Sequence, residues 1–145
     1  MKRLIFIIVL LVGCSAHREF SKRSYDAGQF TFQLPPEMQK VSLKGIDSNF
    51  SEFENSDIVL DFDYGFYSAT LDQLSHNLDY KSHGELINGR EAQIGSCYVL
   101  QLAGRKYHYE IMVNFKKEGL TMRANCKNEK CYATILEVFR SIRFK

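Results

Sequence analysis

The sequence predicts an α+β domain whose mainly antiparallel sheet is covered by helices. Two observations predict this class: several segments alternate apolar and polar residues with the period of a strand, and the last segment has the period of a helix. The aromatic composition agrees, because 11 Phe and 8 Tyr without any Trp suit a pleated, half-buried surface. With 145 residues, 45% of them apolar, the chain is expected to form one domain with a core and is not a disordered tail.

The first half of the domain is expected to consist of strands. Strands or short extended pieces are predicted at residues 30–34, 38–43, 50–53 and 57–64. The first of these alternates cleanly and ends at a Pro pair, which cannot donate to a sheet ladder. In the fourth, the apolar even-numbered side chains face one way, and Asp61 and Asp63 face the other.

A short helix and a hairpin follow. Residues 70–78 carry Leu at helical spacing, with Thr70 as the expected N-cap. Asn88-Gly89 predicts a type I′ turn, because both residues accept positive φ angles. The turn leads into residues 91–102, which are predicted to form one long or bulged strand, with the bulge or other irregularity at Gly95.

The last part of the chain predicts two more strands and a closing helix. Strands over 106–115 and 120–126 alternate apolar and polar residues. From Cys131 to Ile142 the apolar residues recur at helical spacing, which predicts an amphipathic helix whose apolar face lies on the sheet. The aromatic side of the strand over 106–115 is expected to form the core wall against this helix; a ligand-binding face is the alternative interpretation.

This order of elements resembles the PsbP-like fold, which is named for an extrinsic photosystem II subunit and shared by a small Ran-binding protein and many bacterial lipoproteins. The matching segments are the opening Phe-Thr-Phe-Gln-Leu-Pro at 30–35, the Ile-Asn-Gly-Arg-Glu-Ala turn at 87–92, the hairpin strand over 107–115 and the closing residues 135–144. The resemblance implies a noncatalytic scaffold over residues 28–145 that docks other proteins.

The N-terminus has the pattern of an export signal. Lys2 and Arg3 precede an unbroken apolar run over residues 4–12. As a helix this run would span about 14 Å, against roughly 30 Å for a bilayer core, so it is too short to cross but has the length of a signal-peptide core. We therefore expect residues 1–13 to be a signal peptide.

The end of this run, Leu11-Val12-Gly13-Cys14, resembles the bacterial lipobox. The resemblance implies diacylglycerol on the Cys14 thiol, cleavage between Gly13 and Cys14, and acylation of the new amino terminus. Several acyl chains would hold the protein on a membrane, because each buried CH₂ contributes roughly 0.8 kcal/mol. The alternative is an ordinary secretory signal in which Cys14 is incidental.

Residues 14–27 are then the lipidated Cys and a flexible tether, since they lack apolar periodicity. By analogy with lipoprotein sorting, Ser15 after the Cys implies the periplasmic face of the outer membrane in a Gram-negative cell. Without residues 1–13 the chain carries 17 basic and 17 acidic side chains, and no basic cluster stands out, so a nucleic-acid partner is not expected.

Three cysteines remain for the domain. Cys126 and Cys131 flank a polar turn, and an exported domain lies in an oxidising compartment, so a structural disulfide between them is predicted. A redox or metal site is the alternative, although the spacing is not Cys-x-x-Cys. Cys97 lies in an apolar stretch and is expected to be a buried, inert thiol; an exchange-active thiol is the alternative.

The acidic residues offer two interpretations. Asp61-Phe62-Asp63 has the spacing that begins a calcium loop, but the later ligands fail to follow, so two solvent-facing acids are the better interpretation. Together with Glu52, Glu54 and Asp57 they would form a negative patch for a basic partner.

No enzyme motif is found. The histidines His76, His83 and His108 have no acid or Cys at ligand spacing and are expected to be ordinary surface residues, and no cofactor or metal is predicted. The sequence therefore favours a lipid-anchored envelope protein that binds another protein. The alternative is a lipoprotein that binds a small apolar ligand or lipid between sheet and helix.

Overall fold

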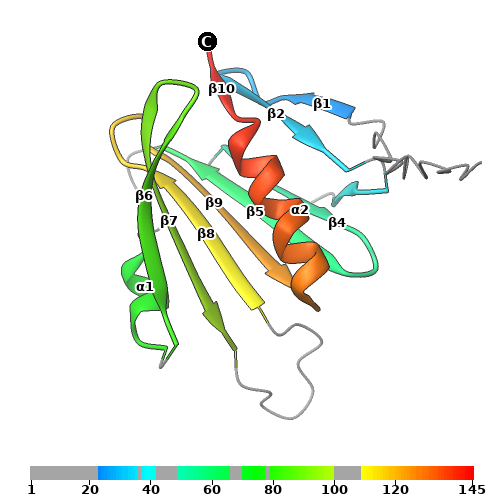
Figure 1. Ribbon diagram of the computed structural model, residues 1–145. Helices are drawn as coiled ribbons and strands as arrows, with labels where there is room; N and C mark the ends of the chain where they lie inside the picture. The colour runs from blue at the N-terminus through cyan, green and yellow to red at the C-terminus, as the bar shows by residue number, and fades with distance from the viewer. Residues whose placement is uncertain (1–22, 36, 42–48, 66–69, 78, 100–108) are drawn as a thin grey trace, which may run out of the picture.

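The computed structural model describes residues 23–35, 37–41, 49–65, 70–77, 79–99 and 109–145 (Figure 1). The elements in chain order are β1 (Arg23–Asp26), β2 (Phe30–Leu34), β3 (Gln39–Val41), β4 (Asn49–Glu54), β5 (Ile58–Tyr64), α1 (Asp72–Ser75), β6 (Lys81–Ile87), β7 (Arg90–Tyr98), β8 (Tyr109–Phe115), β9 (Leu120–Cys126), α2 (Glu129–Arg140) and β10 (Arg143–Phe144). The structure is therefore dominated by strands.

The strands form two sheets. The larger has the order β3-β4-β5-β9-β8-β7-β6, and every neighbouring pair in it is antiparallel. Three hairpins make up most of it, and the pairing of β5 with β9 joins the first hairpin to the later ones. The smaller sheet has the order β1-β2-β10, with β2 in the middle.

One face of the large sheet is buried. Helix α2 contacts β8 and β9 on this face, and Figure 1 shows the helix in front of the sheet with the small sheet beside it. The interior-facing residues of α2 recur at helical spacing: Cys131, Ile135, Val138 and Phe139 are buried. The expected helix therefore forms, but it begins at Glu129 and ends at Arg140.

Aromatic rings hold the small sheet against β4 and β5. Phe30 of β2 meets Phe62 edge to face at 5.1 Å between ring centroids, and Phe32 meets Phe53 at 5.9 Å. Tyr25 of β1 contacts Phe53 at 4.8 Å. Because Phe30, Phe32 and Phe53 are fully buried, these contacts join the two sheets into one core.

The predicted tether is wrong from Arg23 onward, because β1 pairs with β2 along its whole length. The domain therefore begins before Gly28. The sequence signal was weak because Tyr25 is the one apolar side chain that this edge strand turns toward the core, while its other residues are exposed.

The Asn88-Gly89 turn is confirmed. The two residues have φ angles of 50° and 81°, and Ile87 pairs with Arg90 across them. The Asn88 side chain also donates to the Arg140 and Ile142 carbonyl oxygens, at 3.1 and 2.7 Å. This residue therefore forms the turn and fastens the hairpin to the end of α2.

The bulge expected at Gly95 is absent. β7 pairs in regular register with both β6 and β8 through this position. A Cβ atom at Gly95 would lie 3.0 Å from Leu71 and from Tyr80 side-chain atoms, so the glycine makes room for these two residues on the outer face. We refer to residues 70–77, 79 and 80, which contain α1, as the α1 segment. The helix itself is shorter than predicted, Asp72–Ser75, and its N-cap residue is Leu71 rather than Thr70.

Candidate functional site

Over β4, β5 and β9, the face of the large sheet that points away from α2 is charged. Glu52 of β4, Asp61 of β5 and Arg123 of β9 are direct cross-strand neighbours on this outer face. Glu54 and Asp63 occupy alternate positions on the same strands and therefore share the face. We refer to Glu52, Glu54, Asp61 and Asp63 as the acidic patch.

Asp61 and Arg123 form an ion pair at the centre of the acidic patch. Arg123 Nε lies 3.1 Å from Asp61 Oδ2, and Asp61 is 7% exposed. Burial raises the pKa of the Asp61 carboxyl; the Arg123 guanidinium opposes this rise, and the negative charges of Glu52 and Glu110 add to it. The patch therefore has an excess of negative charge that one arginine does not balance.

The negative patch was predicted in part. The structure brings Glu52 and Asp61 together and places Glu54 and Asp63 on the same face. Asp57 does not join them, because it lies in the β4–β5 turn, where its Oδ1 pairs with Lys127 Nζ at 3.2 Å. The expectation that Asp61 faces solvent is wrong, because the neighbouring side chains and Arg123 cover it.

Sequence reasoning missed Arg123 and Glu110. Both alternate with buried residues on central strands, so their outward direction could have been read from the pattern. Their proximity to Asp61 could not, because it depends on β5 pairing with β9 across more than fifty residues of chain. Among the described residues, no group of three or more His, Cys, Asp and Glu is arranged to hold a metal ion.

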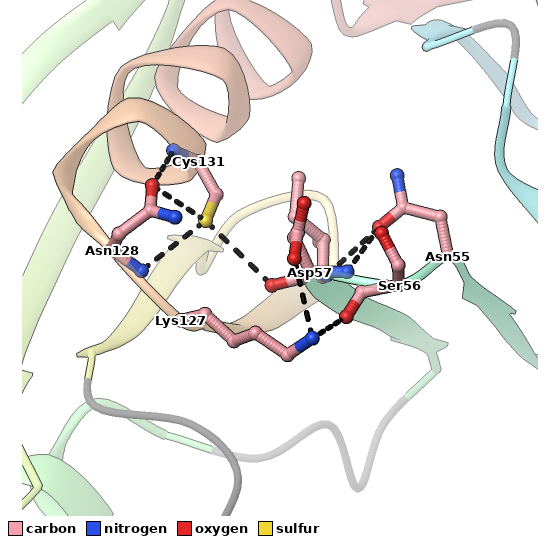
Figure 2. Close-up of polar contacts among 7 residues, drawn as sticks. Asn55, Ser56, Asp57, Lys127, Asn128 and Cys131 are labelled. Carbon is pink, nitrogen blue, oxygen red and sulfur yellow. Dashed lines mark hydrogen bonds and ion pairs between the residues drawn. The ribbon is translucent and has the colours of Figure 1, made fainter.

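The predicted disulfide is absent: Cys126 and Cys131 are both free thiols in the structure. Figure 2 shows the Cys131 thiol within the capping contacts of α2 instead. Two acceptors lie within reach of its one S–H hydrogen, Asn128 Oδ1 at 3.3 Å and the Asp57 carbonyl oxygen at 3.6 Å, and its Sγ accepts from the Asn128 backbone N–H at 3.4 Å. Cys131 is the third residue of α2, and its thiol takes part in the capping box with Asn128.

These contacts join two distant parts of the chain. Lys127 Nζ reaches the Ser56 carbonyl oxygen and the Asp57 carboxylate, and the Lys127 amide donates to the Asp57 carbonyl oxygen at 3.1 Å. The β4–β5 turn is therefore fastened to the junction of β9 and α2. Burial, together with the adjacent Cys131, raises the pKa of the Cys126 thiol well above its usual range, so this thiol stays protonated.

Cys97 is buried on the outer face under the α1 segment. It packs in a small cluster with Leu74 and Met112. Burial, with added repulsion from Glu110 and Asp79, raises the pKa of the Cys97 thiol to about 11. Its burial is as predicted, and a protonated thiol is a poor nucleophile.

Two of the three histidines singled out in the sequence lie on the described surface. His76 is exposed after α1, and His83 on β6 has its Nε2 3.5 Å from Glu85 Oε2; His108 lies outside the described residues.

The strand β8 turns Ile111, Val113 and Phe115 toward α2, where they are fully buried. This confirms the core-wall interpretation for residues 109–115; residues 106–108 of the predicted strand lie outside the described residues.

Gly13, Cys14 and the rest of the predicted signal and tether up to residue 22 lie outside the described residues. Among those that are described, no helix is long and apolar enough to span a membrane.

Two surface hollows bear on ligand binding. One, of about 540 Å³, lies on the outer face beside β6 and is lined in part by Gly84, Leu86 and Gln93. The other is a groove of about 100 Å³ between α2 and the end of β2, next to Leu34 and Val138. The groove is smaller than the several hundred Å³ of a typical ligand pocket.

The strand-dominated domain, with its central antiparallel sheet and one long helix packed on it, has a PsbP-like fold by comparison with a solved structure. A solved structure with the same architecture is the solution structure of cyanobacterial PsbP (CyanoP) from Synechocystis sp. PCC 6803. The TM-score is 0.52 at 14% sequence identity, over 93% of this chain and 99% of that chain. At this identity the likeness shows the fold alone. No protein-family model and no curated protein matches the chain.

Proposed function

We propose that the protein is a membrane-anchored cell-envelope lipoprotein whose domain is a noncatalytic module for binding another protein. The acidic patch carries the binding half of this proposal. Its four carboxylates lie on one face, where Glu54 is exposed and Glu52 and Asp63 are partly exposed. Helix α1 packs on the same face, but over Gly95 and Met112 at the β7–β8 side.

The partner that suits this surface is a protein with a basic face. A surface of partly buried charges of one sign raises the rate at which it meets a protein surface of the opposite charge, and it repels proteins of like charge. The central Asp61–Arg123 pair adds a fixed geometry, because its half-exposed guanidinium can also receive a carboxylate from the partner. Recognition would then combine two contacts: basic residues of the partner with the acidic patch, and one acidic residue of the partner with Arg123.

The alternative function, binding an apolar ligand between sheet and helix, has less support. The described space between α2 and the sheet is filled by side chains such as Ile135, Phe139 and Met122, each fully buried. An apolar ligand would have to displace them, at a cost of several kcal/mol for the disrupted packing.

The anchoring half is supported by the Leu11-Val12-Gly13-Cys14 pattern and is tested separately. Cys14→Ser in the full chain should remove acylation, prevent cleavage after Gly13 and move the protein out of its normal membrane fraction. Mass analysis of the N-terminus measures acylation and cleavage, and fractionation measures the location. A Cys14→Ser product that still fractionates and migrates like the parent chain would refute lipid anchoring.

The binding half is tested by purifying the tagged, full-length chain after cross-linking in cells. Cross-linking should recover a partner less well as the salt concentration rises, because the contact is electrostatic. The double variant Glu52→Lys with Glu54→Lys should abolish this recovery. The matched control, Glu37→Lys with Glu137→Lys, makes the same change of charge on exposed residues elsewhere and should leave recovery unchanged. Equal recovery with both pairs would refute the acidic patch as the docking surface.

A further inference from the structure

Within the part of the chain that the structure describes, no strand lies beyond β6, which is an edge of the large sheet. It is the outermost strand in the sheet order, and in Figure 1 it forms the left edge. Residues Lys81, Ser82, His83 and Gly84 are all exposed, as is Leu86 at 71%. A strand of this length with an exposed leucine can add a further strand through its backbone groups.

The pairing register identifies which backbone groups point outward. Ile87 and Arg90 close a two-residue turn, so they form a hydrogen-bonded pair and Ile87 directs its amide and carbonyl at β7. Lys81, His83 and Glu85, which alternate with it, also direct their amides and carbonyls at β7. The residues between them, Ser82, Gly84 and Leu86, therefore direct their amides and carbonyls away from the sheet.

The sequence of this edge complements itself. We infer that β6 pairs antiparallel with β6 of a second copy of this chain, with the two-fold axis at Gly84. In this register Ser82 exchanges hydrogen bonds with Leu86 of the second copy, and the two Gly84 residues pair with each other. All residues of Lys81–Ile87 find a partner.

Side-chain pairing favours this register over its neighbours. On the α2 face, His83 of each copy comes opposite Glu85 of the other, where an imidazole can hydrogen-bond to the carboxylate that Arg140 of the same chain also binds. Moving the axis to Glu85 would set the two Glu85 carboxylates against each other. Moving it to His83 would set two imidazoles together and leave Leu86 and Ile87 without a partner inside the strand.

The outer face fits as well. Gly84 presents no side chain at the axis, so nothing obstructs the approach of the second strand. Leu86 would lie opposite the second copy's Ser82 and diagonal to its Tyr80, where part of its exposed surface is covered. Joining the sheets would also protect this seven-residue edge from the addition of unrelated strands.

Engineered cysteines in the full chain test the pairing in intact cells treated with a thiol oxidant. Gly84→Cys should give a disulfide-linked dimer on a denaturing gel, because paired Cα atoms at this type of site are about 5.5 Å apart, within disulfide range. The added Cβ meets only the flexible Gln93 side chain closely, at 3.3 Å. The control Gln93→Cys lies one strand further in, on the same face, and should give no dimer.

A second pair of variants checks the register without changing Gly84. Ser82→Cys and Leu86→Cys should each run as a monomer on the denaturing gel when expressed alone, because neither cysteine faces its own copy, and should cross-link when the two chains are expressed together. Adding Leu86→Pro to Gly84→Cys should abolish the dimer while leaving the β6–β7 ladder intact, because the amide that proline removes points outward. The inference is refuted if Gly84→Cys gives no more dimer than Gln93→Cys and the mixed chains stay monomeric, or if β6 cross-links to a different protein.

Discussion

At the scale of single residues, Asp61 shows how much a position depends on its neighbours across the sheet. The alternation along β5 places it on the outer face, yet it is 7% exposed because Glu52 and Arg123 flank it on the adjacent strands. Its carboxylate is partly desolvated and has Arg123 as its ion-pair partner. The stability of this site should therefore depend on pH.

We expect Arg123→Met to lower the free energy of unfolding at neutral pH by roughly 1–3 kcal/mol, the usual cost of leaving a buried polar group unpaired, reduced where solvent screens it. The pKa of Asp61 is raised above its ordinary value of 3.8, so the native carboxyl takes up a proton at higher pH than the unfolded one. Because Arg123 lowers this pKa, the variant's Asp61 has a still higher pKa, so the loss should be largest above the variant's pKa and shrink as the pH falls from there through the native pKa. Urea unfolding across this pH range measures it.

The control for this prediction is the double variant Asp61→Asn with Arg123→Met, which has no carboxylate to leave unpaired. It should be more stable than Arg123→Met alone at neutral pH, and the difference should vanish in acid. If Arg123→Met shows the same loss at every pH, Asp61 is not the group responsible.

Asn128 illustrates a residue whose role is entirely local. Its side-chain oxygen accepts hydrogen bonds from the Lys130 and Cys131 amides, at 3.0 and 3.2 Å. Asn128→Ala should cost about 1 kcal/mol, the usual value of an N-cap. Urea unfolding of this variant should be compared with that of Lys130→Ala, whose exposed side chain makes no capping bond; equal stability of the two variants would contradict the role.

At the scale of elements, the α1 segment and β7 are fitted to each other. Leu71 and Tyr80 occupy the space that a side chain at Gly95 would need. The residues packed around this point form a separate small core on the outer face, with Leu74, Cys97 and Met112 at its centre. This packing positions a helix that is only four residues long and has no side-chain cap.

Gly95→Ala should therefore destabilise the protein by about 1–3 kcal/mol, the usual cost of overpacking a core. Thermal unfolding measures the loss. Leu71→Ala should relieve part of it, so the double variant should lose less than the sum of the two single changes. Additive losses would show that Leu71 and Gly95 do not compete for the same space.

At the scale of the whole molecule, the last strand closes the small sheet over the core. β10 pairs with β2, and the Lys145 amide donates to the Gln29 carbonyl oxygen at 3.1 Å. The Phe144 ring packs on Phe30 and on Phe115, at 6.1 and 5.1 Å between ring centroids. The C-terminal residues thus contact both sheets.

We expect Phe144→Ala to lower the free energy of unfolding by about 1–3 kcal/mol, less than for a fully buried phenylalanine because its ring is partly exposed. Arg143→Ala is the matched control on the same strand, since Arg143 is exposed, and should have little effect. Urea unfolding distinguishes them, and similar losses for both would contradict a role for the ring in joining the sheets.

Local sequence patterns predicted two kinds of element: turns set by their own residues, and strands or helices whose buried residues recur at a regular spacing. The alternation in β2, β5 and β9 and the Asn88-Gly89 turn were predicted correctly, because side-chain period and turn conformation are properties of neighbouring residues. β1 was missed because an edge strand with one inward-facing aromatic residue has almost no pattern.

Two errors came from features that depend on distant partners. Gly95 was interpreted as a bulge because a glycine inside a strand usually breaks the ladder, and only the position of the α1 segment reveals its role in packing. The Cys126–Cys131 pairing was inferred from spacing, but the β4–β5 turn supplies a carbonyl oxygen that accepts from the Cys131 thiol. Nothing near Cys131 in the sequence indicates that contact.

By itself, the sequence determined the strand-rich character, the amphipathic closing helix and the main hairpin turn, because these follow from the order of apolar side chains along short stretches. The tertiary structure alone decided that β5 pairs with β9, that Asp61 meets Arg123, and that β6 is left at the edge. Which strands become neighbours depends on how the whole core packs, and alternation along a strand specifies the buried face but not the strand beside it.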